Sequence, residues 1–185
     1  MKTTSPLGPT LVTPRLILRP TDAEDFERWA EFMADPESAR FLGGVQLRST
    51  AWRGFATMAG SWVVRGYGMF SLLERSTGRW VGRIGPWQPE GWPGTEVGWG
   101  LHPDATGKGY AVEAATAAID WAFEHLGWTE VVHAIAPENL PSAKVAERLG
   151  SRILRRSRLP PPLESYEVDV WGQSHEEWRA RRTSA

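Results

Sequence analysis

The chain contains no cysteine, and this absence excludes several kinds of chemistry at once. Disulfides, a thiolate nucleophile and cysteine-ligated zinc all require that residue. The four histidines, His102, His125, His133 and His175, also show no close ligand spacing. We therefore expect no metal site, and we interpret His133 as a strand residue whose hydrogen bonds are satisfied locally.

A strong net charge and a long apolar run are also missing. The formal net charge of -1 offers no field that would attract nucleic acid or an anionic membrane. No apolar run approaches the ~20 residues of a membrane span, and the N-terminus lacks the apolar core of a signal peptide. We expect a cytoplasmic protein that binds neither nucleic acid nor membrane. One local basic cluster is interpreted as a solvated strand edge; it comprises Arg152, Arg155, Arg156 and Arg158.

Motifs of three other enzyme classes are absent. The run Gly107-Lys108-Gly109 does not have the spacing of a P-loop, and a dinucleotide fingerprint would need a third glycine. No Gly-x-Ser-x-Gly elbow indicates a hydrolase.

What the chain does contain is enough apolar material for one core. It has 185 residues, of which 41% are hydrophobic, and this length favours a single domain over residues 1–185. Residues 1–9 are expected to form a mobile polar tail. Of the eleven tryptophans, most must be core residues, and some are expected to line a binding groove.

The first half of the sequence predicts one strand, two helices and three strands. The strand covers residues 11–19, and a capping box of Thr21 and Glu24 begins a helix that ends at Asp35. The second helix covers residues 49–64, and its expected buried stripe is Trp52, Phe55, Ala56, Ala59 and Val63. Strands at 67–74, 80–87 and 95–101 are joined by short turn-forming segments, so we expect an antiparallel meander.

The second half alternates helices and strands. A helix over 107–126 is followed by a buried strand at 130–136, which suggests a right-handed crossover between near-parallel strands. Asn139 begins another helix that Gly150 ends. The last strands cover 151–156 and 163–171, and Ser174 with Glu177 begins a final short helix.

The junction at residues 101–115 has the features of a phosphate cradle. Several amides at the start of a helix have no partner within the helix, and the helix dipole places partial positive charge there. Gly107 and Gly109 have no Cβ, so the backbone can curl and approach a ligand closely. For a glycine pair alone, the alternative is a tight strand-to-helix turn with no ligand.

Two motifs carry a resemblance to a known family. Thr106-Gly107-Lys108-Gly109-Tyr110-Ala111 resembles the acetyl-coenzyme A (acetyl-CoA) pyrophosphate loop of the GCN5-related N-acetyltransferase (GNAT) family. Thr106 departs from the Arg or Gln that the family prefers there. Residues 137–150 resemble the Asn-x-x-Ser helix of the branch of ribosomal-protein N-terminal acetyltransferases, the RimJ/RimL type. The opening Thr13-Pro14-Arg15-Leu16 is also typical of that branch.

The resemblance implies an α+β fold with a central, mostly antiparallel twisted sheet of about seven strands flanked by helices. A splayed pair of strands would hold the pantetheine arm of acetyl-CoA against the strand that carries Trp99, Gly100 and Leu101. The pyrophosphate would lie on the amides of Gly107, Lys108, Gly109, Tyr110 and Ala111, beside Thr106. The opposite wall would present Asn139, Ser142 and Lys144. Asn139 has the alternative of being a helix cap alone, and Lys144 that of a solvated side chain.

The implied reaction is the attack of a neutral amine on a thioester. A lysine amine with a pKa of ~10.4 is neutral about once in 2,500 at pH 7, so it needs a base more than an α-amine does. Glu96 shares one strand face with Gly98 and Gly100, which leaves space for a ligand beside an acid. We therefore expect Glu96 to act as the general base; the alternative is a surface glutamate. Ser142 is the hydroxyl nearest by motif position to protonate the leaving thiolate; the alternatives are that solvent supplies this proton and that Ser142 only hydrogen-bonds the cofactor.

The acceptor amine is the least specified part of the prediction. Trp52, Trp87 and Trp92 could form an aromatic wall for a peptide terminus or an amphipathic amine. A cationic aminoglycoside would call for clustered acids, which the sequence lacks. A monomer and a homodimer are both compatible with the sequence. The competing function is that of a non-catalytic acyl-CoA-binding sensor or partner module with the same fold.

Overall fold

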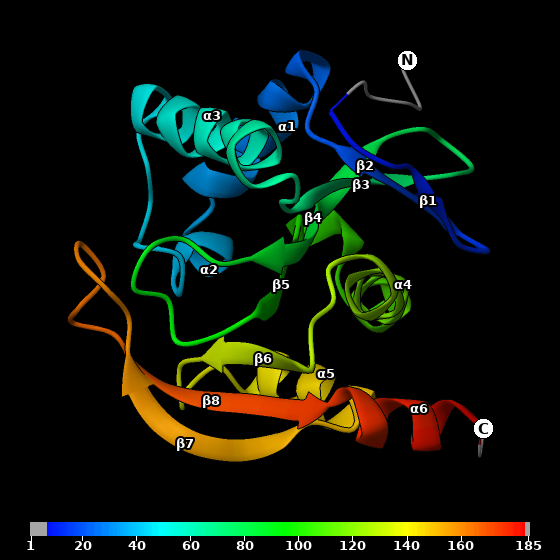
Figure 1. Cartoon of the computed structure of the whole chain (residues 1–185). Helices are drawn as coiled ribbons and strands as arrows, with labels where there is room; N and C mark the ends of the chain where they lie inside the picture. Colours follow the sequence, from blue (N-terminus) through cyan, green and yellow to red (C-terminus); the bar gives the residue numbers. More distant parts are fainter. Residues whose placement is uncertain (1–6, 184–185) are drawn as a thin grey trace.

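The computed structural model describes residues 7–183, which form one mixed sheet covered by helices (Figure 1). The sheet has eight strands in the order β1-β2-β3-β4-β5-β6-β8-β7. Most of the expected mobile tail lies outside the described residues. The strands are β1 (Leu11–Val12), β2 (Leu16–Pro20), β3 (Phe70–Glu74), β4 (Trp80–Trp87), β5 (Glu96–Leu101), β6 (Glu130–Ile135), β7 (Arg152–Arg158) and β8 (Glu167–Ser174).

Six α-helices are distributed along the described chain. They are α1 (Phe26–Ala34), α2 (Pro36–Ala39), α3 (Arg48–Arg65), α4 (Tyr110–His125), α5 (Leu140–Leu149) and α6 (His175–Thr183). The mixed α+β architecture expected from the sequence is confirmed. The eighth strand arises because the expected strand over 11–19 is a hairpin: Thr13 N donates to Leu16 O, and Leu11 pairs with Leu18.

The strands β3, β4 and β5 form the antiparallel meander that the sequence predicts, and β2 also pairs antiparallel with β3. β6 then joins β5 in parallel, but within the described residues the ladder has one register pair, Glu96 with Val132. By contrast, β4 and β5 are paired along the whole of β5, as are β6 and β8 along the whole of β6. The two halves of the sheet therefore separate beyond Glu96.

Each face of the sheet has its own apolar core. Because side chains alternate along a strand, Leu16 and Leu18 of β2 point to the face that α4 covers, where they pack with Phe70 and Ile119. The other face packs against α1 and α3 through a second cluster that includes Trp29, Phe32, Phe55 and Trp80. Figure 1 shows α1, α2 and α3 on one side of the strands and α4 on the other.

Two details of the helices differ from the prediction. The capping box is formed one residue later than expected: Asp22 caps the short 3-10 turn Ala23–Asp25, and Asp25 completes the box. In α3 the buried residues are Ala51, Phe55, Met58 and Trp62, so of the predicted stripe Trp52, Ala56 and Val63 are exposed. The helix contains two overlapping apolar stripes, and packing on α1 selects one of them.

Other local predictions are confirmed. Asn139 caps α5 by accepting from Ser142 N, and Ser174 and Glu177 exchange hydrogen bonds at the start of α6. β7 is the exposed outer strand of the sheet, and three of its arginines form ion pairs across to neighbouring acids. The basic cluster is therefore a solvated strand edge, as expected.

A buried ion pair fixes the entry into α1. Arg19 of β2 is 0% exposed and its guanidinium donates two hydrogen bonds to Asp25, at 2.8 and 2.7 Å. Asp25 also accepts from Asp22 N and from Ser71 Oγ. The carboxylate thus joins β2, β3 and the turn before α1.

We predict that Asp25→Ala lowers the free energy of unfolding by ~3–5 kcal/mol, because it leaves the buried Arg19 cation without its carboxylate. Urea denaturation measures the change. Glu167→Ala, which removes the acid of an exposed pair with Arg158, is the control and should cost at most ~1 kcal/mol. Equal losses in the two variants would contradict the importance of the buried pair.

Candidate active site

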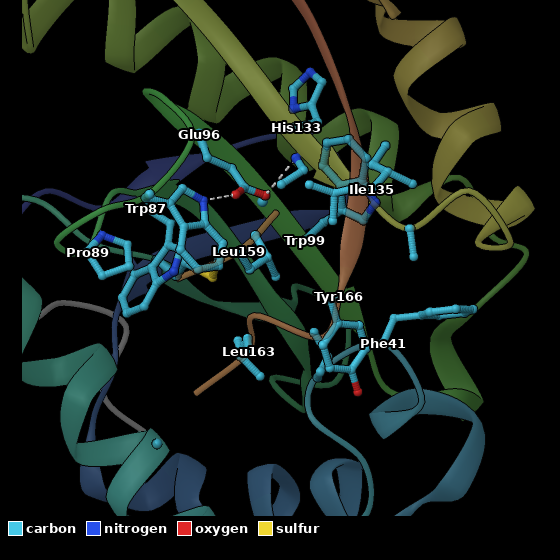
Figure 2. A pocket seen from close by; sticks show the side chains of 18 of the residues that line it. Phe41, Trp87, Pro89, Glu96, Trp99, His133, Ile135, Leu159, Leu163 and Tyr166 are labelled. Carbon is cyan, nitrogen blue, oxygen red and sulfur yellow. Dashed lines mark hydrogen bonds between the residues drawn. The ribbon is translucent and has the colours of Figure 1, made fainter. Parts of the chain in front are cut away.

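A cavity of about 370 Å³ lies where β5 leaves β6, on the side of the sheet that α1 and α3 cover. Its walls come from α1, α3, the strands β4, β5 and β6, and the loop between β7 and β8. Figure 2 shows Glu96 inside this pocket, with Trp87 and Pro89 on one side and Trp99 on the other. Many of the lining residues are aromatic or proline; they include Trp29, Phe41, Trp87, Trp92, Trp99, Pro160, Pro161, Pro162 and Tyr166.

Glu96 is the buried acid of the cavity, with 7% of its surface exposed. Its carboxylate accepts a hydrogen bond from Trp92 Nε1 and one from Ala134 N at 3.4 Å (Figure 2). Burial raises the pKa of Glu96 to about 7, although these two hydrogen bonds and the charge of Arg83 act against the rise. A carboxyl group with such a pKa can accept and release a proton near neutral pH.

The two glycines beside Glu96 make room chiefly for other side chains of the protein. A Cβ on Gly98 would lie 2.7 Å from Met69 Cε, and a Cβ on Gly100 would lie 2.8 Å from Phe32 Cζ. Gly98 lines the cavity, whereas the space above Gly100 is occupied by Phe32. The expected ligand space is therefore next to Gly98.

Trp99, on the opposite face of β5, connects the cavity to α5. Its indole Nε1 donates to Ser142 Oγ at 3.2 Å, and its ring lies 4.7 Å from the His133 ring. Ser142 lines the cavity, so its hydroxyl is placed at the wall as the sequence predicts. Beyond Glu96 the edge of β5 that carries Trp99, Gly100 and Leu101 has no strand partner from β6 among the described residues.

His133 is a structural residue. Its two ring nitrogens lie 2.7 Å from Val97 O and 3.0 Å from Ser151 Oγ. Burial lowers its pKa to about 4, so the ring is neutral at pH 7. Its hydrogen bonds are satisfied locally, in agreement with the prediction.

Of the other residues expected on the α5 wall, one reaches the cavity and one does not. Asn139 lines it and also caps α5. Lys144 has an exposed side chain and is not among the lining residues.

The expected cradle lies at the start of α4, and its backbone has the predicted form. Gly107 and Gly109 have φ angles of 73° and 77°, a left-handed conformation that favours glycine. No atom lies within 4 Å of a Cβ built on Gly107, and residues 106–109 are exposed. Thr106 Oγ1 donates to Pro103 O, so this side chain is used within the turn.

The side chain of Tyr110 points away from the expected cradle. Its ring is buried, and its hydroxyl donates to Glu74 Oε1 at 2.7 Å. Lys108 Nζ lies 3.8 Å from the same oxygen of Glu74. The side chain of Tyr110 therefore anchors the loop to β3.

A second anchor was not foreseen from the sequence. Arg15 donates through Nη1 to Lys108 O at 2.8 Å and through Nε to Glu113 Oε2 at 2.6 Å. Glu113 also accepts from the hydroxyl of Thr13 at 2.6 Å. The motif Thr13-Pro14-Arg15 thus ties the β1–β2 hairpin to the glycine loop. An acid in the first turn of α4 was a signal for this contact, but its partner lies 98 positions away.

The three tryptophans expected in the acceptor wall are separated by the fold. Trp87 and Trp92 line the cavity, and Trp92 contacts Glu96 directly. Trp52 is 50% exposed on α3, where its ring packs edge-on against Phe26 at 4.8 Å, and it does not line the cavity. Trp52 was assigned from a helical stripe that the packing of α3 does not use.

Residues 7–183 contain neither a candidate metal site nor a candidate membrane span. No group of three or more histidine, aspartate or glutamate side chains is arranged to hold a metal ion there. None of the described helices has the length and apolar character needed to cross a membrane.

The buried Glu96 predicts a specific dependence of stability on pH. Its pKa is about 7 in the folded state, above its ordinary value of 4.5, so the fold keeps the proton more tightly than the unfolded chain does. The stability that protonated Glu96 contributes to the fold is fully present below pH 4.5 and is lost as the pH rises through 7. Relative to Glu96→Gln, the parent should lose ~3 kcal/mol of unfolding free energy between about pH 4 and pH 8. If the unfolding free energies of the parent and Glu96→Gln change by the same amount between pH 4 and pH 8, the raised pKa is contradicted.

Comparisons with known proteins agree with this geometry. A family model described as an acetyltransferase (GNAT) domain matches residues 15–152. An acetyltransferase from Agrobacterium tumefaciens str. C58 is 36% identical, with a TM-score of 0.78 over 90% of this chain and 95% of that chain. The uncharacterized N-acetyltransferase YnaD of Bacillus subtilis is 25% identical over 171 residues, which are 91% of this chain and 98% of YnaD.

The expected likeness to the ribosomal-protein branch is confirmed at the level of the fold. RimJ of Mycobacterium smegmatis, solved in complex with CoA-disulfide, has a TM-score of 0.68 at 20% identity, over 92% of this chain and 87% of that chain. The family model covers far more than half of the 185 residues and includes both the glycine loop and Glu96. The chain therefore belongs to the GNAT family of acetyltransferases.

Proposed function

We propose that the protein transfers an acetyl group from acetyl-CoA to a primary amine by direct attack of the amine on the thioester. The observation that carries this proposal is Glu96, a buried carboxyl with a pKa of about 7 on the wall of a cavity at the divergence of β5 and β6. The reaction needs a base at such a position, because the acceptor must lose a proton to become an amide.

Two open features of the backbone support a path for acetyl-CoA. The pantetheine arm would lie in the gap between β5 and β6, with its amides against the free edge at Trp99, Gly100 and Leu101. The pyrophosphate would lie on the exposed loop at 106–109 and on the amides that begin α4, where the helix dipole attracts an anion. Both glycines of this loop have the positive φ that such a curl requires.

In the transfer, Glu96 would accept the proton that the amine loses. With a pKa of about 7 the carboxyl is ionised in about half of the molecules at pH 7. The amine nitrogen forms a bond to the acetyl carbon, the carbon–sulfur bond breaks, and the thiolate leaves with the electron pair. Ser142, held by Trp99 on the cavity wall, or water would supply the thiolate with a proton.

The acceptor class is an amine that fits a mostly apolar pocket. A peptide or protein N-terminal α-amine and a small-molecule amine both satisfy the requirement of one free amine beside Glu96. The competing function, a non-catalytic acyl-CoA sensor, would use the cradle but would give the proton acceptor in the cavity no role.

We predict that acetyl-CoA raises the melting temperature of the protein and that Gly109→Glu abolishes the rise. The new carboxylate would repel the pyrophosphate and obstruct its approach. Gly127→Glu is the matched control, because Gly127 also has a positive φ of 66°, has open space around it, and lies beyond the far end of α4. Thermal unfolding with and without ligand measures the effect. A normal rise in Gly109→Glu would place the cradle elsewhere.

We predict that Glu96→Gln lowers turnover by ~10² to 10⁴ while the affinity for acetyl-CoA stays nearly unchanged. In the parent, kcat/KM should rise with pH through about 7 as Glu96 ionises. The loss in the variant should shrink at higher pH, because solvent then delivers the amine already neutral. CoA release from pH 6 to 9 measures both profiles.

Three outcomes of that experiment are informative. A loss that is constant across the pH range would indicate a structural glutamate. Equal rates in the variant and the parent would remove Glu96 from the reaction. Binding of acetyl-CoA without turnover of any amine would favour the sensor.

A further inference from the structure

Among the described residues, Arg83 is the one arginine or lysine that lines the cavity, and its guanidinium has weak partners. It lies on β4 directly opposite Gly100 of β5, on the same face of the sheet as Glu96 and Gly98. It lines the cavity. Among the described residues its Nε is buried without a hydrogen-bond partner, and its Nη1 donates to the thioether of Met69.

These surroundings do not neutralise the charge of Arg83. A thioether is a weak acceptor, and the Trp29 ring centroid lies 5.6 Å from Cζ. No carboxylate oxygen of residues 7–183 lies within ion-pair distance of this guanidinium, although the charge of Glu96 acts on it through space. Burial lowers the pKa of Arg83 to about 10, which leaves it a cation at pH 7. Arg83 is partly buried and its Nε is enclosed, and such a guanidinium without an oxygen acceptor is costly unless a bound group supplies one.

We propose that Arg83 binds a carboxylate of the acceptor, so that the acceptor is a small apolar amine that also carries a carboxylate, such as an amino acid. This inference rests on the proposed function and narrows its acceptor class. Glu96 and Arg83 give the cavity a buried acidic side chain and a cation, the complement of the ammonium and carboxylate of a zwitterion; Glu90, the other lining acid, is exposed. Arg is suited to this contact because its planar fork offers paired donors to a carboxylate.

The rest of the cavity favours an apolar side group on that acceptor. Trp29, Met33, Leu42 and Met58 line the wall formed by α1, its following segment and α3, and the β7–β8 loop adds Leu163. A volume of about 370 Å³ is at the lower end of the range for small-molecule sites, so a compact ligand fits better than a folded protein surface. An aromatic or branched amino acid meets both requirements.

The test compares each amino acid with its carboxamide. Phenylalanine with phenylalaninamide, and leucine with leucinamide, differ in the charge that Arg83 would bind. CoA release gives kcat/KM for both members of each pair with the parent, Arg83→Met and Arg83→Lys. The ratio of acid to amide is then compared between proteins, so that the different amine pKa values within a pair cancel.

We expect Arg83→Met to lower the acid-to-amide ratio about tenfold to a hundredfold, the usual worth of hydrogen bonds to a charged group. Arg83→Lys, which keeps the charge but loses the fork, should lie between the parent and Arg83→Met. Arg79→Met is the control: it removes an arginine just before β4 that pairs with Asp104 and does not line the cavity, and the ratio should not change.

The outcomes separate this inference from the proposed function. An unchanged ratio in a folded Arg83→Met would overturn the carboxylate contact while acetyl transfer stands. A C-terminally amidated tetrapeptide that outperforms the amino acids in the parent would also overturn it, in favour of a peptide terminus. If no amine is acetylated although acetyl-CoA raises the melting temperature, the transfer itself fails. If Arg83→Met does not fold, the acid-to-amide ratio of Arg83→Lys is compared with that of the parent instead.

Discussion

The separation of β5 from β6 is the constraint on which the site depends. Continuous pairing would satisfy the backbone of both strands and leave no edge for a ligand. Here the ladder has the pair of Glu96 with Val132, and the amide of Ala134, two residues further along β6, donates to the carboxylate of Glu96. The side chain of Glu96 thus lies where the pairing between β5 and β6 ends and accepts a hydrogen bond from a backbone amide of β6. The divergence of β5 from β6 therefore both opens a gap between the two strands and buries Glu96 at the point where that gap begins.

The pKa of Glu96 is set by opposing effects of its surroundings. Desolvation alone favours the protonated form, while Trp92, Ala134 and Arg83 favour the ionised form. The resulting pKa of about 7 is near the optimum for a base that operates at neutral pH. His133, buried a short distance away, has a lowered pKa instead and is held by two hydrogen bonds. Burial therefore produces a candidate base from one residue and a neutral structural ring from the other.

The parts of the fold that sequence reasoning located are those with local signals. The bounds of β4, the caps at Asn139 and Ser174, and the paired glycines before α4 each depend on a few adjacent residues. The buried face of α3 was misassigned because Trp52 and Trp62 lie on different stripes and are equally apolar. Trp62 is buried because it packs against Phe70 of β3 and Trp121 of α4, and that information is not local.

The same distinction holds within the site. Glu96 was identified because two glycines on its own strand indicated space beside an acid, although part of that space belongs to Phe32 and Met69. Arg15 and Glu113 form their contact across 98 positions, and the acid in the first turn of α4 does not by itself identify Arg15 as its partner. Arg83 lies in a strand whose alternation gives no reason to bury an arginine. Its position follows from the strand register, which sets it opposite Gly100.

That register also explains why Arg83 and Glu96 share a cavity without forming an ion pair. Arg83 is opposite Gly100 and Trp87 is opposite Glu96, so the two charged residues are offset by four positions along the strands. At about 3.3 Å per residue, their backbones are separated by roughly 13 Å along the strand direction. A direct ion pair would hold the pKa of Glu96 well below 7 and would leave it a poor base. The offset leaves space between the two charged side chains, and a zwitterionic acceptor that places its amine toward Glu96 and its carboxylate toward Arg83 would give each of them a partner of opposite charge.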